Sequence, residues 1–293
     1  MATQTDTFQL PSSAVMSYAI NRPGYDGPII LLSNPLCTTF EIWDHVIPYL
    51  TALGFNVVRY NAPGHGESGA PANNLSLTTM DSLAEDVRYL LDHLEIETLH
   101  AWIGVSLGAA TAIHFAAKYP RIVERLIACD TISCSPINEG AVDYFTPRIV
   151  AVRRAGNLDE YIQETLDRWF GRPWLDANPR EADRVRNLMQ DVSLDGFVTC
   201  CSALQNQSFD LRAWAVGTGS HVEAAMLLVG EKDTALFRNM EDLRKDIEGG
   251  LRNKKGDDNV SVRLEVVLNG GHLCFIDGLD SFLRIINHFL TNN

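Results

Sequence analysis

Long apolar segments and an excess of basic residues are both missing from this 293-residue sequence. No apolar run approaches the roughly 20 residues that span a bilayer, so we expect no transmembrane helix and no membrane partner. Acidic residues outnumber basic ones by 37 to 24, and the net charge of −13 argues against a nucleic-acid partner. The first eleven residues lack the basic start and apolar core of a signal peptide. These absences predict a cytoplasmic globular protein.

Cysteine is also sparse. The six cysteines are scattered and none has the CxxC spacing of a zinc or redox site: Cys37, Cys129, Cys134, Cys200, Cys201 and Cys274. We therefore expect free, buried thiols rather than a disulfide framework. The remaining composition, 46% hydrophobic and 21% charged, is typical of a globular protein with a substantial core.

Short apolar runs alternate with helical patterns along most of the chain. The runs are bounded by Gly, Pro, Asn or Asp, as fully buried parallel strands are, and cover residues 28–32, 55–60, 99–103, 126–130, 225–229 and 264–268. Helical patterns cover residues 40–53, 80–94, 107–118, 239–248 and 280–290. The alternation predicts an α/β fold with a mostly parallel central sheet and helices on both faces. Residues 249–259 are charged and contain glycine, which predicts a surface loop.

The alternation stops between Ser133 and Thr218. Four helical patterns follow one another there, at about residues 142–154, 158–170, 178–191 and 194–204. A helical insertion between two strands of a parallel sheet is typical of a lid over the carboxyl ends of the strands. We therefore predict a core of residues 1–132 and 219–293, with a helical lid at residues 133–218.

The most informative motif is the Gly-x-Ser-x-Gly sequence from Gly104 to Gly108, centred on Ser106. It lies between a predicted strand and a predicted helix, the context of a nucleophile elbow, which is a strained turn that exposes a catalytic serine. Side chains at positions 104 or 108 would clash with neighbouring backbone, which accounts for both glycines. The motif predicts that Ser106 is the nucleophile of a hydrolase.

A serine nucleophile needs a base, and the base needs an orienting acid. After such an elbow the acid and then the histidine follow in chain order. Asp233 and His272 each follow a predicted strand, at the same edge of the sheet as Ser106. Asp130, which ends the strand after the elbow, is an alternative acid, and Glu231 is another. The pattern predicts the triad Ser106, Asp233 and His272.

The oxyanion of a tetrahedral intermediate needs two backbone donors. The first expected donor is the N–H of Leu107, and the second comes from the loop after the first predicted strand. Pro35 in this loop has no N–H, so we predict Leu36 as the second donor, with Cys37 as the alternative. His65, on a loop near the same edge, is expected to brace that loop.

With these residues in place, the sequence resembles the α/β-hydrolase superfamily, and within it the 3-oxoadipate enol-lactonases. The family's Ser-Asn-Ser-Leu-Gly-Thr-Thr loop is similar to residues 33–39, and its Arg-Tyr-Asp-x-Arg-Gly-His-Gly stretch is similar to residues 59–66. An adjacent cysteine pair in the family's lid resembles Cys200 and Cys201. The resemblance carries the family's triad onto the three residues predicted above.

Three departures from the family lie near the expected mouth of the site. Pro35 replaces a residue with an N–H, Cys37 replaces a glycine and Pro63 replaces an arginine. Hydrolase chemistry remains the expectation, but these changes leave the substrate open. We predict a serine hydrolase that opens a lactone or cleaves a small carboxylic ester without metal or cofactor. The alternatives are a hydrolase of C–C bonds or a cyclisation catalyst with the same triad, and a non-catalytic binding protein.

An enol-lactone of the 3-oxoadipate type carries a carboxylate, which a protein of net charge −13 would repel unless a local cation offsets the field. The lid offers Arg148, Arg153 and Arg154 on one predicted helix and Arg168 on the next. We expect at least one of them, with Arg148 and Arg154 as candidates, to face a pocket whose apolar wall contains Trp169 and Phe170. The expected partner is therefore a small-molecule lactone or ester. The sequence does not indicate an oligomeric state.

Overall fold

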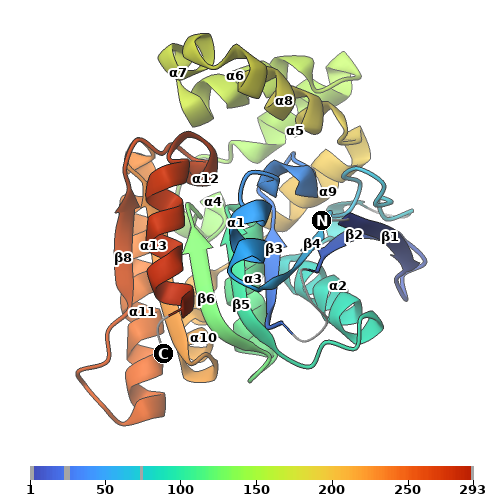
Figure 1. Cartoon of the computed structure of the whole chain (residues 1–293). Coiled ribbons are helices and arrows are strands. Elements are labelled where there is room, and N and C mark those ends of the chain that lie inside the picture. The colour runs from blue at the N-terminus through green and yellow to red at the C-terminus, as the bar shows by residue number, and fades with distance from the viewer. Residues whose placement is uncertain (1–2, 23–26, 73–74, 292–293) are drawn as a thin grey trace.

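The protein is described by a computed structural model that covers residues 3–22, 27–72 and 75–291. Eight strands form one sheet in the order β1-β2-β4-β3-β5-β6-β7-β8 (Figure 1). The strands are β1 (Thr3–Gln9), β2 (Val15–Asn21), β3 (Ile29–Ser33), β4 (Asn56–Tyr60), β5 (Leu99–Val105), β6 (Val123–Cys129), β7 (Ala224–Gly230) and β8 (Arg263–Val267). All pairs from β4 to β8 are parallel, so their carboxyl ends share one edge of the sheet. The expected α/β fold is confirmed.

Helices cover both faces of this sheet (Figure 1). One layer contains four helices that contact one another in series: α2 (Met80–His93), α3 (Leu107–Lys118), α10 (Ala215–His221) and α11 (Phe237–Lys255). The opposite face carries α1 (Ile47–Ala52) and α13 (Leu279–Thr291), with the short α12 (Cys274–Asp277) before α13. Such double coverage explains why the parallel strands read as continuous apolar runs in the sequence.

A group of helices between β6 and β7 lies over the carboxyl ends of the strands (Figure 1). They are α4 (Pro136–Glu139), α5 (Phe145–Ala155), α6 (Asp159–Phe170), α7 (Arg172–Ala177), α8 (Pro179–Gln190) and α9 (Leu194–Gln205). The boundary at residue 218 proposed from the sequence falls inside α10, and α10 contacts the core helices α3 and α11. We call residues 136–205 the lid.

The hairpin of β1 and β2 was not predicted from the sequence. It extends the parallel part of the sheet at one edge, where β1 pairs antiparallel with β2 and β2 pairs antiparallel with β4. Most of β1 is exposed, and its TQTDTFQ sequence has no buried face to impose an apolar alternation. Backbone pairing, rather than burial of side chains, therefore holds this edge strand.

The surface loop predicted at residues 249–259 is wrong in its first half, because α11 continues as a helix to Lys255. Gly250, which suggested a loop, lies at a close crossing of two helices. A Cβ at Gly250 would lie only 1.9 Å from the carbonyl oxygen of Val216 on α10. The glycine thus serves helix packing and does not end the helix.

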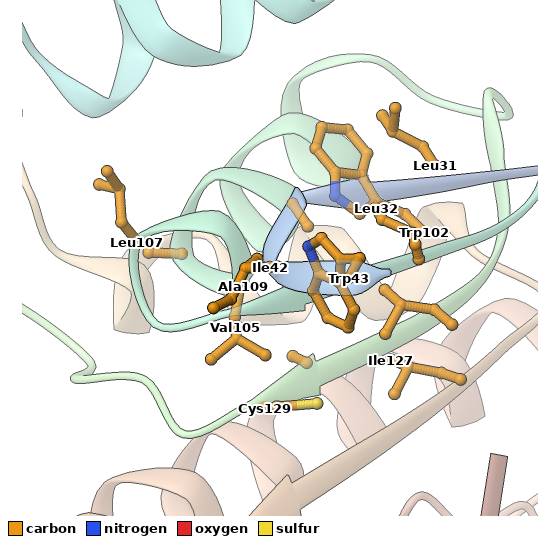
Figure 2. Packing of buried hydrophobic residues seen from close by; sticks show 14 of the residues in the cluster. Leu31, Leu32, Ile42, Trp43, Trp102, Val105, Leu107, Ala109, Ile127 and Cys129 are labelled. Carbon is orange, nitrogen blue, oxygen red and sulfur yellow. The ribbon is translucent and has the colours of Figure 1, made fainter. Parts of the chain in front are cut away.

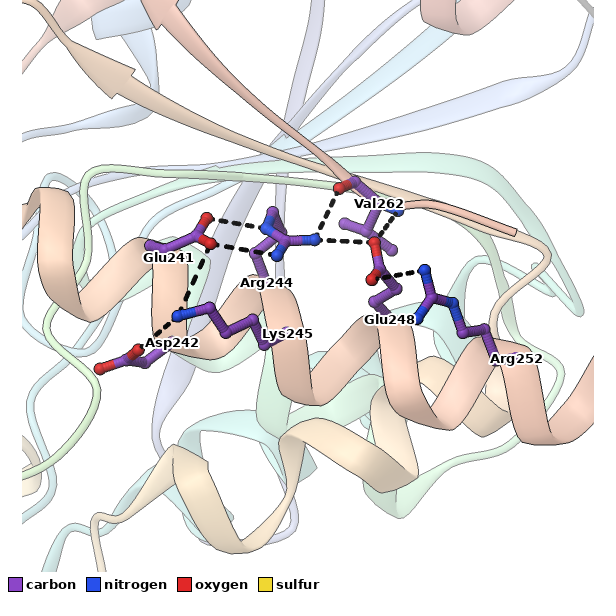
Figure 3. Close-up of polar contacts among 7 residues, drawn as sticks. All are labelled: Glu241, Asp242, Arg244, Lys245, Glu248, Arg252 and Val262. Carbon is purple, nitrogen blue, oxygen red and sulfur yellow. Dashed lines mark hydrogen bonds and ion pairs between the residues drawn. The ribbon is translucent and has the colours of Figure 1, made fainter. Parts of the chain in front are cut away.

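Ion pairs at helical spacing reinforce this stretch of α11 (Figure 3). Glu248 pairs with Arg244 at 2.7 Å and with Arg252 at 2.9 Å, and both partners lie four positions away. The Glu248 carboxylate also accepts the N–H of Val262 at 2.9 Å. One acidic side chain therefore joins two helical turns to the segment that leads into β8.

Two buried tryptophans fix the carboxyl end of β3, next to the predicted site (Figure 2). The indole N–H of Trp102 donates to Ser33 Oγ at 2.7 Å, and that of Trp43 donates to Asn34 Oδ1 at 3.0 Å. The ring of Trp43 also stacks on Phe275, with centroids 4.0 Å apart. Each indole N–H would cost about 1–3 kcal/mol if it were buried without a partner. The two indole N–H groups thus hold Ser33 and Asn34 in place, where β3 ends and the next loop begins.

Within the described ranges, no helix is both long enough and apolar enough to cross a bilayer. The six cysteines are all buried and free, as the sequence predicts.

Candidate active site

Ser106 occupies a strained turn between β5 and α3. Its backbone has φ 55° and ψ −116°, a conformation that a residue with a side chain rarely adopts. A Cβ at Gly104 would lie 2.6 Å from the backbone of Gly108, and one at Gly108 would lie 2.4 Å from the carbonyl oxygen of Ser33. The two glycines therefore have the steric role that the sequence predicts. This geometry is that of a nucleophile elbow.

His272 and Asp233 meet although 39 residues separate them. The Nδ1 atom of His272 lies 2.6 Å from Oδ2 of Asp233, and both side chains are less than a fifth exposed. Asp233 follows β7 and His272 follows β8, so the parallel strands bring their loops to the same edge. A carboxylate only accepts, so Nδ1 of His272 is the donor in this bond, and Nε2 is the ring nitrogen left for another partner. Ser106, Asp233 and His272 line one cavity.

Asp130, the alternative acid, lies deeper at the same edge. It is fully buried after β6, and its Oδ1 accepts the N–H of Gly230 at 2.8 Å, while Oδ2 has no partner among the described residues. Burial, together with the negative charge of Asp233, raises the pKa of Asp130 well above its usual range. Burial thus favours the neutral carboxyl form of Asp130 in the folded protein. The second alternative, Glu231, accepts the N–H of Asn269 at 2.8 Å.

The neutral state of Asp130 predicts how stability depends on pH. The unfolded chain releases this proton near pH 4, whereas the folded protein retains it, so folding stability falls as pH rises towards the raised pKa. Asp130→Asn preserves the acceptor for Gly230 and has no proton to lose. The variant should become progressively more stable than the wild type between pH 5 and pH 8, by at most about 1.4 kcal/mol per pH unit.

Chemical denaturation of both proteins across this pH range measures the difference. A constant difference between pH 5 and pH 8 would mean that Asp130 is ionised in the folded state.

The loop after β3 presents backbone groups to the same cavity. The side-chain amide of Asn34 donates to the carbonyl of Tyr60 at 3.2 Å, and the backbone carbonyl of Asn34 accepts the N–H of Gly108 at 3.0 Å. Cys37 adopts φ 67°, the left-handed region that favours the glycine found in the resembled family. The loop therefore keeps a glycine-like backbone despite the substitution.

His65 uses the N–H of Cys37, the alternative oxyanion donor. Cys37 N–H donates to Nε2 of His65 at 3.1 Å, and Nδ1 of His65 donates to the carbonyl of Pro63 at 2.9 Å. Burial lowers the pKa of His65 to about 4, so the ring stays neutral and Nε2 remains an acceptor. Of the two candidate N–H groups in the loop, that of Leu36 has no acceptor among the residues that the structure describes, and Leu36 lines the cavity.

The cavity has a volume of about 240 Å³ and lies between the strand ends and the lid. Of the predicted pocket residues, Arg148 and Trp169 line it, as does Arg168. Phe170 and Arg154 do not line it, which corrects the expectation from the sequence. Phe170 is buried within the lid and stacks on Trp174, with centroids 4.5 Å apart, while Arg154 is exposed on the outer face of α5.

Arg148 and Arg168 have no carboxylate partner in the part of the chain that the structure describes. The Arg148 guanidinium lies over the ring of Tyr144, 4.9 Å from its centroid, and Arg168 contacts the hydroxyl of Thr165 at 3.4 Å. Two cations in a negatively charged protein thus face the cavity with their charges unpaired by protein carboxylates.

Two tyrosines that the sequence analysis missed complete this lid side, Tyr144 and Tyr161. Burial raises the pKa of the Tyr161 phenol, so its hydroxyl stays protonated and can donate a hydrogen bond. Tyr161 lies on the apolar face of α6. Helical spacing alone does not distinguish a tyrosine that lines a pocket from one that packs in the core. The cavity therefore combines aromatic walls with two guanidinium groups and two phenols.

Comparisons with known proteins agree with this fold. A family model described as "alpha/beta hydrolase fold" matches residues 28–279. Two curated relatives are 3-oxoadipate enol-lactonases 1 and 2 of Acinetobacter baylyi, which are 31% and 29% identical over 64% and 61% of this chain. The matches span 66% and 63% of those relatives. The enol-lactonase of Burkholderia xenovorans LB400 superposes with a TM-score of 0.80, at 27% identity, over 95% of this chain and 97% of its own. The resemblance expected from the sequence is confirmed.

Proposed function

Because the chain belongs to the α/β-hydrolase fold family, we propose that it is a serine hydrolase that opens a lactone or cleaves a small carboxylic ester. The observation that carries the proposal is the 2.6 Å bond between His272 and Asp233 at the edge of the cavity that also contains the elbow serine, Ser106. The resemblance to two enol-lactonases supports the lactone as the bond class. The natural partner is a small molecule.

In the proposed mechanism, Nε2 of His272 takes the proton of Ser106 as the serine oxygen attacks the carbonyl carbon of the substrate. Asp233 holds the proton on Nδ1 and stabilises the imidazolium that forms. Collapse of the tetrahedral intermediate breaks the bond to the ring oxygen, and His272 returns the proton to that leaving oxygen. A water molecule activated by His272 then releases the acyl group from Ser106.

We assign the oxyanion hole to the N–H groups of Leu107 and Leu36. Leu107 follows the nucleophile at the start of α3, where the first N–H groups of a helix have no internal partner. Leu36 is favoured over Cys37 because the N–H of Cys37 already donates to His65. A fixed oxyanion donor of this kind contributes roughly 10²–10³-fold to kcat in serine hydrolases.

The lid arginines favour a substrate that carries a carboxylate. A bound carboxylate near Arg148 and Arg168 would gain charge-assisted hydrogen bonds, each worth about 1.5–3 kcal/mol. The phenol of Tyr161 supplies a further neutral donor on the same side of the cavity. The reacting carbonyl of such a molecule would lie towards the strand ends, and its carboxylate towards the lid.

A matched substrate panel tests both the bond class and the charge preference. The panel contains lactones and p-nitrophenyl esters in carboxylated and neutral pairs, together with a β-diketone. We expect turnover of lactones or esters, and none of the β-diketone. Arg148→Gln and Arg168→Gln should each raise KM for the carboxylated compound by about 10–100-fold and leave KM for its neutral partner within about threefold.

Arg154→Gln is the control, because Arg154 lies on the same helix as Arg148 but outside the cavity. Equal effects of the two pocket variants on charged and neutral substrates would mean that the pocket binds neutral molecules. Cleavage of the β-diketone at carbon, without ester turnover, would overturn the proposed reaction itself.

A further inference from the structure

The lid contacts the proposed base directly, through one residue at the end of α6. The carbonyl oxygen of Trp169 accepts the backbone N–H of His272 at 3.3 Å. The indole of Trp169 also stacks on the imidazole of His272, with centroids 5.5 Å apart and planes inclined by 23°. Trp169 is only 4% exposed, so both contacts are shielded from solvent. A single lid residue therefore contacts both the backbone and the side chain of the base.

The backbone of the base loop passes very close to this helix end. A Cβ at Gly271 would lie 2.0 Å from the carbonyl oxygen of Trp169, so only glycine fits between the loop and the lid. On its other side, Gly271 N–H is held by both carboxylate oxygens of the fully buried Asp277, at 2.9 and 2.8 Å. The N–H of Lys232 donates to the carbonyl of Gly270 at 2.9 Å, which joins this loop to the loop of the acid. The base loop is thus fixed between core and lid.

The contact also has an electrostatic consequence. Trp169 is the second-last residue of α6, and carbonyl groups in the last turn of a helix have no partner within the helix. Its carbonyl oxygen therefore belongs to the negative end of the helix dipole, next to His272. The face of the indole likewise attracts positive charge. Both features favour the imidazolium that forms as His272 takes the proton of Ser106.

We propose that Trp169 is a positioning residue for the base, and that the end of α6 holds His272 in its reactive orientation. This inference rests on the proposed function, because it takes His272 as the base. Arg168, the preceding residue, lines the cavity, so a substrate anion bound there contacts the same helix end that holds the base. The lid then takes part in catalysis as well as in substrate binding.

Substitutions at position 169 distinguish a role of Trp169 in positioning His272 from a role as a wall of the pocket only. Trp169→Leu removes the stacked ring, and we expect kcat for p-nitrophenyl acetate to fall about 10–100-fold while KM stays within about twofold. Trp169→Phe keeps an aromatic face and should retain most of kcat. Trp174→Leu is the control, because Trp174 stacks on Phe170 in the lid and does not line the cavity.

A second variant tests the backbone contact without changing the tryptophan. Gly271→Ala places a methyl group against the Trp169 carbonyl and should lower kcat to a similar extent. Gly249→Ala is its control, because a Cβ at Gly249 meets nothing within 4 Å. The low-field proton NMR signal of the His272–Asp233 bond should shift or broaden in both test variants and remain unchanged in both controls.

A rise in KM with unchanged kcat and an unchanged NMR signal would overturn the inference and make Trp169 a pocket wall only. A fall in melting temperature without loss of kcat in the folded protein would mean that Trp169 contributes to stability only.

Measuring Ser106→Ala in the same assay distinguishes failure of this inference from failure of the proposed function. If Ser106→Ala is inactive while both test variants keep kcat, the positioning role fails and the proposed function stands. If Ser106→Ala is active, the proposed function fails, and the NMR signal alone decides whether Trp169 orients His272.

Discussion

Ser106→Ala should lose at least roughly 10⁴-fold in kcat towards any ester or lactone that the wild type hydrolyses. The variant removes the oxygen that attacks the carbonyl, and no other side chain replaces it in the elbow. The fold should be retained, because the change removes one oxygen atom and no core volume, and the strained backbone at φ 55° is unchanged. Steady-state kinetics, with thermal unfolding as the check on folding, measures both effects.

Ser208→Ala is the matched control, since Ser208 is exposed, follows the lid in sequence and lies outside the cavity. It should behave as the wild type. Activity of Ser106→Ala within tenfold of the wild type would exclude the serine mechanism.

Asp233→Asn should have the second-largest effect, a loss of roughly 10⁴-fold in kcat. An amide at this position can present an N–H to Nδ1 of His272, which favours the tautomer with the proton on Nε2. That tautomer cannot accept the proton of Ser106. Asp130→Asn should stay within about tenfold of the wild type, because burial raises the pKa of Asp130 and its Oδ1 bonds the N–H of Gly230 instead of the histidine.

The two aspartate variants are matched, since both replace a carboxyl at the end of a neighbouring strand with an amide of the same shape. Measurement of kcat for both with the same p-nitrophenyl ester ranks them directly. The reverse order would move the acid to the end of β6.

The sequence predicted the parallel part of the sheet, in which all strands but the edge strand β8 are largely buried. The six apolar runs became β3 to β8, and the helix after Ser106 begins and ends where its pattern indicates, at Leu107 and Lys118. Strand β1 was not predicted, because most of its side chains face solvent and give no apolar pattern. Helix α11 was predicted too short, because a glycine such as Gly250 is typical of a helix end. Glycine at a helix crossing and glycine at a helix end are identical in a single sequence.

The pocket was predicted less well than the strand-end residues. Asp233 and His272 could be predicted to meet because each follows a short apolar run, and parallel strands end at one edge of a sheet. The sequence favoured Leu36 over Cys37 as the second donor but could not show the reason, which is the bond from the N–H of Cys37 to His65, 28 residues away. Helical spacing could have shown which arginine of α5 faces the pocket. Arg148 lies three residues from the buried Phe145, on its face, whereas Arg154 lies on the exposed face of the same helix.

The central claim is that Ser106 forms an acyl-enzyme. Its most direct test is rapid acid quenching of the enzyme during turnover of a p-nitrophenyl ester, followed by peptide mass spectrometry. The account predicts an acyl group on the peptide that contains Ser106, located on the serine itself and absent from Ser106→Ala. An acyl group on a different residue, with Ser106 unmodified during turnover, would contradict the account.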